Sequence, residues 1–169
     1  MKRVAIVITI IIILTIILII SLYLNRDLVE KKKEILEKAE IILKYEDREV
    51  ILNKENIMLY DEEFEAVLDT STSGPSNHTY KGIQLKDLLG NNNVNFQDKT
   101  IIIKGVDGFA VAYSSEEVLK DKNIYIAYME DGKYLGSRES GGTGPYQSII
   151  VSDTFSNRRC KWIIEIEVK

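Results

Sequence analysis

Residues 140–151, SGGTGPYQSIIV, join a glycine-rich loop to a short apolar strand. Because glycine has no Cβ, Gly142 and Gly144 leave backbone N–H groups uncovered and free to turn toward a small anionic or polar ligand. The apolar residues 149–151 would anchor the loop in a sheet. A plain turn between two strands explains the same residues, so the stretch alone supports either a binding loop or a connection.

The composition predicts one folded domain. The chain has 169 residues, of which 45% are hydrophobic, enough for one core once the N-terminus is set aside. Cys160 is the single cysteine of the sequence, which excludes an intramolecular disulfide and a cysteine-based zinc cluster. His78 is the single histidine, and this argues against a zinc or haem site made of protein ligands alone.

The N-terminal stretch is the most apolar part of the chain. Residues 4–24 carry no charge and are mostly isoleucine. A helix of this length would be about 31 Å long, close to the thickness of the hydrocarbon layer. A cleaved signal peptide would have a shorter apolar segment and a small-residue cleavage site. We therefore predict a transmembrane signal anchor at residues 1–24, with a single span in the cell membrane.

The charges on either side of this stretch bear on its orientation. Lys2 and Arg3 favour an N-terminus on the inside, whereas the basic run at residues 31–33 argues for the reverse. A first apolar segment with a very short basic tail commonly acts as an uncleaved signal anchor. The C-terminal domain is therefore expected to be extracytoplasmic.

Residues 25–45 predict a helical linker or stalk. They contain no glycine or proline, and apolar pairs recur every seven residues. A dimerising coiled coil and a helix that packs one face on the following domain both explain this pattern. A homodimer through residues 25–45 is therefore one candidate assembly.

The following domain is acidic. From residue 46 onward the chain has 14 basic and 21 acidic residues, a net charge of −7. This balance argues against nucleic acid as a partner, because binding to phosphates requires a basic surface.

Residues 46–169 have the short periodic segments of an α+β domain. Extended segments are predicted at residues 49–52, 56–60, 64–70, 80–83, 99–104, 109–113, 123–129, 133–135 and 160–168. The first two are expected to form a hairpin, and residues 71–79 a polar loop. One short helix follows residue 84, and a second begins with a capping box of Ser114 and Glu117. In the last segment Trp162 is expected on the buried face. The many strands favour a mainly antiparallel or mixed sheet.

Five motifs then follow one another in a recognisable order. They are YKGIQLKDLL at 80–89, VDGF at 106–109, IYIAY at 124–128 followed by DG at 131–132, GPY at 144–146, and KWI at 161–163. This succession resembles the molybdopterin-binding domain of sulfite oxidase-like oxidoreductases, over roughly residues 49–169. The resemblance implies a domain of that sheet type and molybdopterin as the cofactor if the family activity is retained.

The resemblance also implies a metal ligand that is missing here. In that family molybdenum is held by the pterin dithiolene and one cysteine thiolate, in a loop upstream of the Y-x-G-V segment. The corresponding residues 70–79 contain no cysteine. Ser71 and Ser73 are nearest in kind, but a hydroxyl is a poor substitute for a soft thiolate. Cys160 lies far along the chain from this position.

The family's basic groups are only partly present. An arginine is implied after the glycine–proline segment, where this chain has Gln147, which cannot form a charged two-pronged contact with phosphate. Lys161 matches the family's lysine before the tryptophan, and Arg158 and Arg159 add positive charge. The predicted pocket consists of Ser71, Ser73, Gly142, Gly144, Tyr146, Gln147, Arg158, Arg159 and Lys161. No catalytic residue and no metal ligand is assigned.

Three functional interpretations follow. The first is a membrane-anchored pseudoenzyme: a non-catalytic module that binds a small ligand or a protein partner. The second is an active molybdopterin-dependent oxidoreductase, and the third a structural or signalling spacer on a dimeric stalk. A hydrolase is not favoured, because the sequence has no G-x-S-x-G motif and no second histidine or nucleophilic cysteine for a triad.

Overall fold

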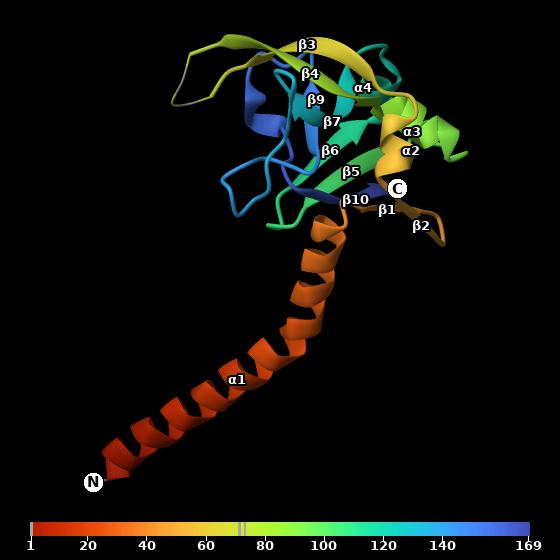
Figure 1. Ribbon diagram of the computed structural model, residues 1–169. Helices are drawn as coiled ribbons and strands as arrows, with labels where there is room; N and C mark the ends of the chain where they lie inside the picture. Colours follow the sequence, from red (N-terminus) through yellow and green to blue (C-terminus); the bar gives the residue numbers. More distant parts are fainter. Residues whose placement is uncertain (1, 71, 73) are drawn as a thin grey trace. The chain divides into compact units, whose positions relative to one another are not determined.

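The computed structural model describes residues 2–70, 72 and 74–169. The chain forms two compact units, the first ending at Glu34 and the second spanning Ile35–Lys169. The first unit is part of one long helix, and the second contains the strands described below (Figure 1).

Helix α1 spans Lys2–Glu37. Its sequence contains no glycine or proline, which favours an uninterrupted helix. Large apolar side chains along it are not covered by other parts of the chain: Ile10, Leu14 and Leu18 are 51%, 60% and 59% exposed. Among the described residues, no helix is both long enough and apolar enough to span a bilayer, and this finding does not support the span predicted at residues 4–24.

The helix predicted for residues 25–45 is wrong in its last part. Ala39 takes a left-handed conformation with φ 52°. The N–H of Ala39 donates to the carbonyl of Leu36, and that of Glu40 to the carbonyl of Ile35, which closes the helix. Strand β1, Ile41–Tyr45, follows. Of the apolar pairs that suggested a helical repeat, Ile42 and Leu43 lie in this strand and are buried in a sheet.

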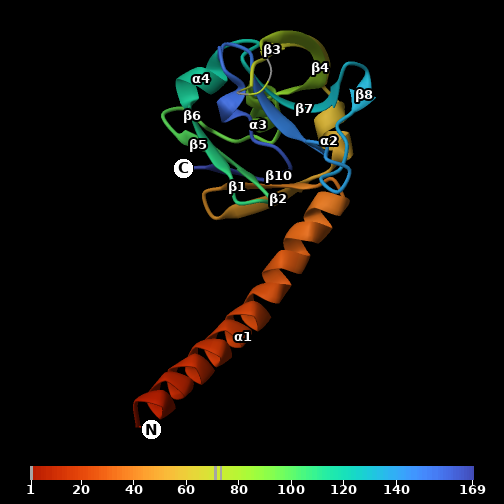
Figure 2. The same ribbon diagram turned by 90° about the vertical axis from the view of Figure 1, so that its left-hand side faces the viewer.

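In the part of the chain that the structure describes, ten strands form two sheets. The first sheet has the order β2 (Arg48–Leu52), β1, β10 (Ile163–Val168), β5 (Thr100–Gly105) and β6 (Ala110–Ser114), side by side in Figure 2. The second has the order β3 (Glu62–Leu68), β4 (Ser76–Gln84), β7 (Ile124–Glu130) and β8 (Lys133–Tyr134), and β9 (Gln147–Ile150) also pairs with β7. The β1–β10 pair is parallel, and the other recorded pairs are antiparallel. The predicted α+β class with a mixed, mainly antiparallel sheet is confirmed.

Short helical segments connect these strands: α2 (Lys54–Met58), α3 (Leu85–Asn91), α4 (Ser115–Leu119) and the 3-10 helix η1 (Ser156–Arg158). The capping box predicted for α4 is confirmed, because the Glu117 N–H donates to Ser114 Oγ at 3.2 Å and the Ser114 N–H to Glu117 Oε2 at 3.0 Å.

The hairpin predicted for residues 49–60 is wrong, because α2 occupies its second half and β2 pairs with β1 instead. Asn53 caps α2: its Oδ1 accepts the Asn56 N–H at 3.1 Å, while Asn56 Oδ1 accepts the Asn53 N–H at 2.9 Å. This is a capping box built from two asparagines, without the serine and glutamate of the usual signature.

The main core is built from residues of both sheets and of α3. Its fully buried members include Leu43 of β1, Ile83 of β4, Ile103 of β5 and Ile166 of β10. A second, smaller cluster covers the opposite face of the second sheet. It consists of Ala66, Tyr80, Tyr125, Ala127 and Ile149, with Phe64 packed against them. The second sheet therefore separates two buried clusters.

The start of β10 differs from the predicted alternation. Trp162 takes a left-handed conformation with φ 50° and is only partly buried. A bulge between Ile163 and Glu165 shifts the register, so that Ile163 and Ile164 are both buried. The prediction that Trp162 lies on the buried face of the strand is therefore wrong.

Replacement of Ile166 tests this core. Ile166 is 0% exposed in the centre of the first sheet, so Ile166→Ala should lower the free energy of unfolding by about 2–5 kcal/mol. Ile51→Ala is the matched control, because Ile51 is 59% exposed on the edge strand β2, and its effect should stay within about 0.5 kcal/mol. Urea denaturation followed by tryptophan fluorescence measures both. Equal losses would contradict the strand order.

A second test uses the carboxylates of β10. Glu165 accepts hydrogen bonds from Lys104 at 2.6 Å and Lys44 at 2.7 Å, and Glu167 accepts one from Lys104 at 2.7 Å. Burial raises the pKa of Glu165, but the two lysines outweigh it and the pKa is lowered. The pKa of Glu167 is lowered chiefly by the bond from Lys104.

Because these pKa values are depressed by folding, the stabilisation is present above the ordinary glutamate pKa of 4.5 and is lost as the pH falls through the folded values. We expect Glu165→Gln to reduce stability at neutral pH and to flatten the acid side of a stability–pH curve. A variant whose acid-side slope matches the parent's would argue against this role.

Candidate functional site

The glycine loop is held by close contacts with the preceding turn. A Cβ on Gly142 would overlap the Gly136 carbonyl, and one on Gly144 would overlap the Leu135 carbonyl. The Gly144 N–H donates to the Gly136 oxygen at 2.9 Å, and the Gly142 oxygen accepts the Trp162 indole N–H at 2.8 Å. The glycines thus allow two segments of backbone to lie against each other. The Gly144 N–H and the Gly142 carbonyl form their hydrogen bonds with other groups of the protein.

Tyr146 and Gln147 lie on opposite sides of the second sheet. Tyr146 packs in the main core, is 1% exposed, and donates its hydroxyl to the Ala39 carbonyl at 3.0 Å. Gln147 begins β9 opposite Ala127, a member of the smaller cluster, and residues paired across strands share a face. One pocket cannot contain both side chains, although the sequence placed them together.

Arg158 is engaged in ion pairs. Its guanidinium donates two hydrogen bonds to Asp153, at 2.6 and 2.8 Å, and one to Glu117 at 2.8 Å. These bonds, first those to Asp153, raise the pKa of Arg158 above its ordinary value. Lys161, three residues further on, is exposed.

Arg159 is buried on the outer side of the second sheet and is only 7% exposed. Its Nη1 donates to the Tyr80 hydroxyl at 2.8 Å, and its Nη2 to the Val67 carbonyl at 2.5 Å. The guanidinium carbon also lies 5.3 Å from the centre of the Tyr80 ring, within the range of a cation–π contact. This cation therefore stabilises the sheet face.

The end of β3 and the η1 segment come together beside Arg159. The Asp69 N–H donates to Ser156 Oγ at 3.0 Å, and the Ser156 N–H donates to the Asp69 carbonyl at 3.1 Å. A hollow of about 470 Å³ opens here, lined by Asp69, Thr70, Phe155, Ser156 and Asn157. Ser71 and Ser73, predicted for the pocket, lie outside the described residues. Gly142 lines a different hollow, next to Gly136 and Lys133.

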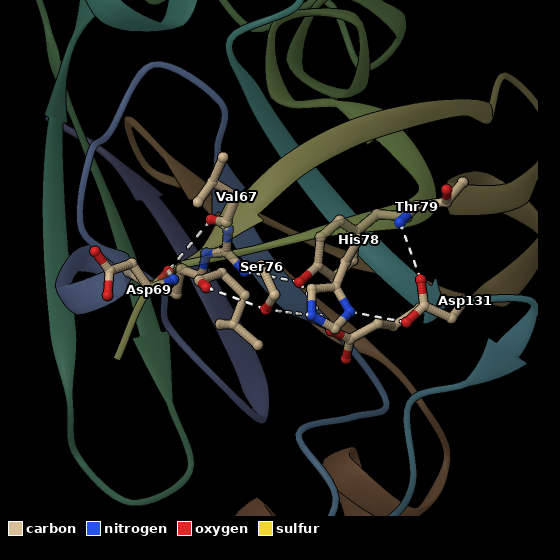
Figure 3. Close-up of polar contacts among 11 residues, drawn as sticks. Val67, Asp69, Ser76, His78, Thr79 and Asp131 are labelled. Carbon is tan, nitrogen blue, oxygen red and sulfur yellow. Dashed lines mark hydrogen bonds and ion pairs between the residues drawn. The ribbon is translucent and has the colours of Figure 1, made fainter. Parts of the chain in front are cut away.

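A polar cluster that the sequence did not predict lies on the outer face of the second sheet, where Arg159 also lies (Figure 3). His78 Nε2 is 2.8 Å from Ser76 Oγ, and His78 Nδ1 is 2.8 Å from Asp131 Oδ2. A second carboxylate, Glu130, places its Oε1 3.2 Å from the same Nδ1. The order serine–histidine–aspartate is that of a hydrolytic triad, but two carboxylates meet this imidazole where a triad has one.

The pairing of β4 with β7 creates this cluster. Tyr80 lies opposite Glu130, and the Asp131 N–H donates to the Thr79 carbonyl at 2.7 Å. These contacts bring together residues about fifty positions apart in sequence. A single S-x-H pair on a strand was the signal that could have pointed to a shared face, because residues two apart point the same way.

A similar α+β fold occurs in a solved structure. Of the solved structures, the sulfane dehydrogenase SoxCD from Paracoccus pantotrophus is similar, with a TM-score of 0.62 and 17% sequence identity. The likeness covers 76% of this chain but only 37% of that one, and at this identity it shows the fold alone.

The family model described as "Oxidoreductase molybdopterin binding domain" matches residues 29–169, and the chain belongs to this family. Comparison with curated proteins finds no match. The resemblance predicted from the sequence is confirmed. It begins earlier than residue 49, because β1 and β2 are part of the domain.

Cys160, the single cysteine of the sequence, does not fit the role of the thiolate that ligates molybdenum in the family. Cys160 is 0% exposed and packs in the main core. Its Sγ lies 3.9 Å from the Phe109 carbonyl and 3.7 Å from the Lys161 carbonyl. Burial, with a smaller effect of Asp107, raises the pKa of this thiol to about 12. A neutral, solvent-shielded thiol is neither a nucleophile nor a metal ligand.

Substitution in the glycine loop tests its structural role. Gly144→Ala should destabilise the domain by about 1–3 kcal/mol, because a Cβ has no room beside the Leu135 carbonyl. Gly90→Ala is the control: it lies in α3 with nothing within 4 Å of an added Cβ, and should be neutral or stabilising by up to about 1 kcal/mol. Thermal unfolding compares the two. A neutral Gly144→Ala would show that the loop is open.

Proposed function

We propose that this chain is a non-catalytic member of its family, which keeps the molybdopterin-binding scaffold and binds a small ligand or a protein partner at the loop edge of the domain. The burial of Cys160 carries the proposal. Catalysis in the family would use a thiolate on molybdenum, and the only thiol of this sequence is a core side chain.

The basic side chains near the loops support the same conclusion. Arg158 is bound to Asp153 and Glu117, and Arg159 to Tyr80 and Val67. To bind a cofactor phosphate, either arginine would have to break these contacts. Gln147 offers no charge in place of the family's arginine, so the affinity for a pterin phosphate should be low.

The hollow beside Asp69 and Phe155 is the binding surface we favour. It combines backbone and side-chain polar groups with the exposed ring of Phe155, which is 62% exposed. It also adjoins the segment that holds the metal ligand in the family. A polar ligand with one flat apolar face, or a loop of a partner protein, fits this mixture.

The test is the cofactor content of the purified full-length chain. The chain is produced with added molybdate in a host that makes molybdopterin, and the molybdenum and the fluorescent oxidised pterin are measured. We expect both far below one equivalent per chain. Cys160→Ser is the control and should leave the trace content unchanged. Stoichiometric molybdenum and pterin in the parent would overturn the proposal, and their loss in Cys160→Ser would identify the thiol as ligand.

We also propose that the apolar part of α1 anchors the chain in the cell membrane, with the domain on the extracytoplasmic side. The charge-free stretch at residues 4–24 and the exposed side chains of residues such as Ile12 and Ile16 support this. Alkaline phosphatase fused to the C-terminus should be active in intact cells. A reporter that is active only in the cytoplasm would contradict the proposed orientation. Recovery of the chain in the soluble fraction would contradict the proposed anchor.

A further inference from the structure

We propose that His78, Glu130 and Asp131 form a binding site for one divalent transition-metal ion, of which Zn²⁺ is the representative, on the outer face of the second sheet. The ligand atoms are His78 Nδ1, one oxygen of Glu130 and one oxygen of Asp131. This site shares no residue with the pocket predicted from the family resemblance and does not depend on the function proposed above.

The spacing of the donor atoms suits a metal. The three donor atoms lie within 4.8 Å of one another. His78 Nδ1 is 2.8 Å from Asp131 Oδ2 and 3.2 Å from Glu130 Oε1. Ligands about 2.1 Å from a common ion at angles near 90–109° are about 3.0–3.4 Å apart, so small rotations of these side chains accommodate an ion. One imidazole with two carboxylates is a donor set suited to Zn²⁺ or Mn²⁺.

Each carboxylate is held by a group outside the donor set. The Thr79 N–H donates to Asp131 Oδ1 at 3.0 Å, which turns the other oxygen, Oδ2, toward His78. The Tyr80 hydroxyl donates to Glu130 Oε1 at 2.8 Å and is itself bound by Arg159. These contacts fix the ligands before an ion arrives, as outer partners do in metal sites.

The imidazole is oriented in the same way. Ser76 Oγ lies 2.8 Å from His78 Nε2, and the same hydroxyl is 3.4 Å from the Leu68 carbonyl, to which it can donate. Ser76 can therefore accept the Nε2–H, which selects the tautomer whose Nδ1 lone pair is free to bind the ion.

The site is open enough for entry and hydration. The side chains of His78, Glu130 and Asp131 are 22%, 28% and 55% exposed. The two carboxylates attract a dication, and water can complete the coordination. The single histidine of the sequence argued against a protein-made metal site, whereas the proposed site adds two carboxylates from the neighbouring strand and the turn after it.

The experiment is isothermal titration of the tag-free, full-length chain with ZnCl₂. We expect one ion per chain. His78→Asn, Glu130→Gln and Asp131→Asn should each weaken binding well over tenfold, and Ser76→Ala, which removes only an outer partner, should weaken it less than they do, by about tenfold. Asp121→Asn is the matched control, because Asp121 is an exposed carboxylate that binds Lys86, and it should leave the affinity unchanged.

Circular dichroism of each variant excludes a loss of folding as the cause. Because a variant can fail to fold, the parent is also measured by X-ray absorption with bound Zn²⁺, which should show only nitrogen and oxygen neighbours, including one imidazole. The proposal would be overturned if the parent does not bind Zn²⁺ stoichiometrically or if the absorption spectrum shows a sulfur neighbour. It would also be overturned if each of the three single ligand variants binds as tightly as the parent.

Discussion

The outer face of the second sheet depends on the hydrogen bonds of the buried Arg159 guanidinium. An arginine side chain stays charged at any accessible pH, so burying it requires hydrogen bonds that replace water. The Tyr80 hydroxyl, the Val67 carbonyl and the Tyr80 ring supply that environment. Because the tyrosine accepts from Arg159, its own proton points at Glu130. A structural requirement thereby fixes the position of a carboxylate beside His78.

The second sheet lies between two buried clusters of the domain. Its inner face closes the main core, where Tyr146 and Cys160 are packed without solvent. Its outer face carries the smaller aromatic cluster. It also carries a series of polar contacts that runs from Arg159 through Tyr80 and Glu130 to His78. Since side chains alternate along a strand, neighbours in the sequence are separated by the sheet. For this reason Tyr146 and Gln147, which are adjacent in the sequence, do not line one pocket.

The sequence predicted the α+β class, the family and most strands, because alternation and turn residues are local signals. It failed where tertiary contacts decide. Residues 41–45 have a helix-compatible pattern but pair with β10, more than a hundred positions away. Residues 54–58 form a helix through an asparagine capping box that lacks the usual signature. The His78 cluster depends on the register of β4 against β7, which no local pattern gives.

The central claim is that the family scaffold persists while the sole thiol of the chain serves packing. The most direct test is the reactivity of Cys160 with Ellman's reagent in the native and the denatured protein. The account predicts no reaction in the native chain, because the thiol is fully buried and its pKa is raised to about 12, and one equivalent after unfolding in guanidinium chloride. Rapid stoichiometric reaction of the native protein would contradict it.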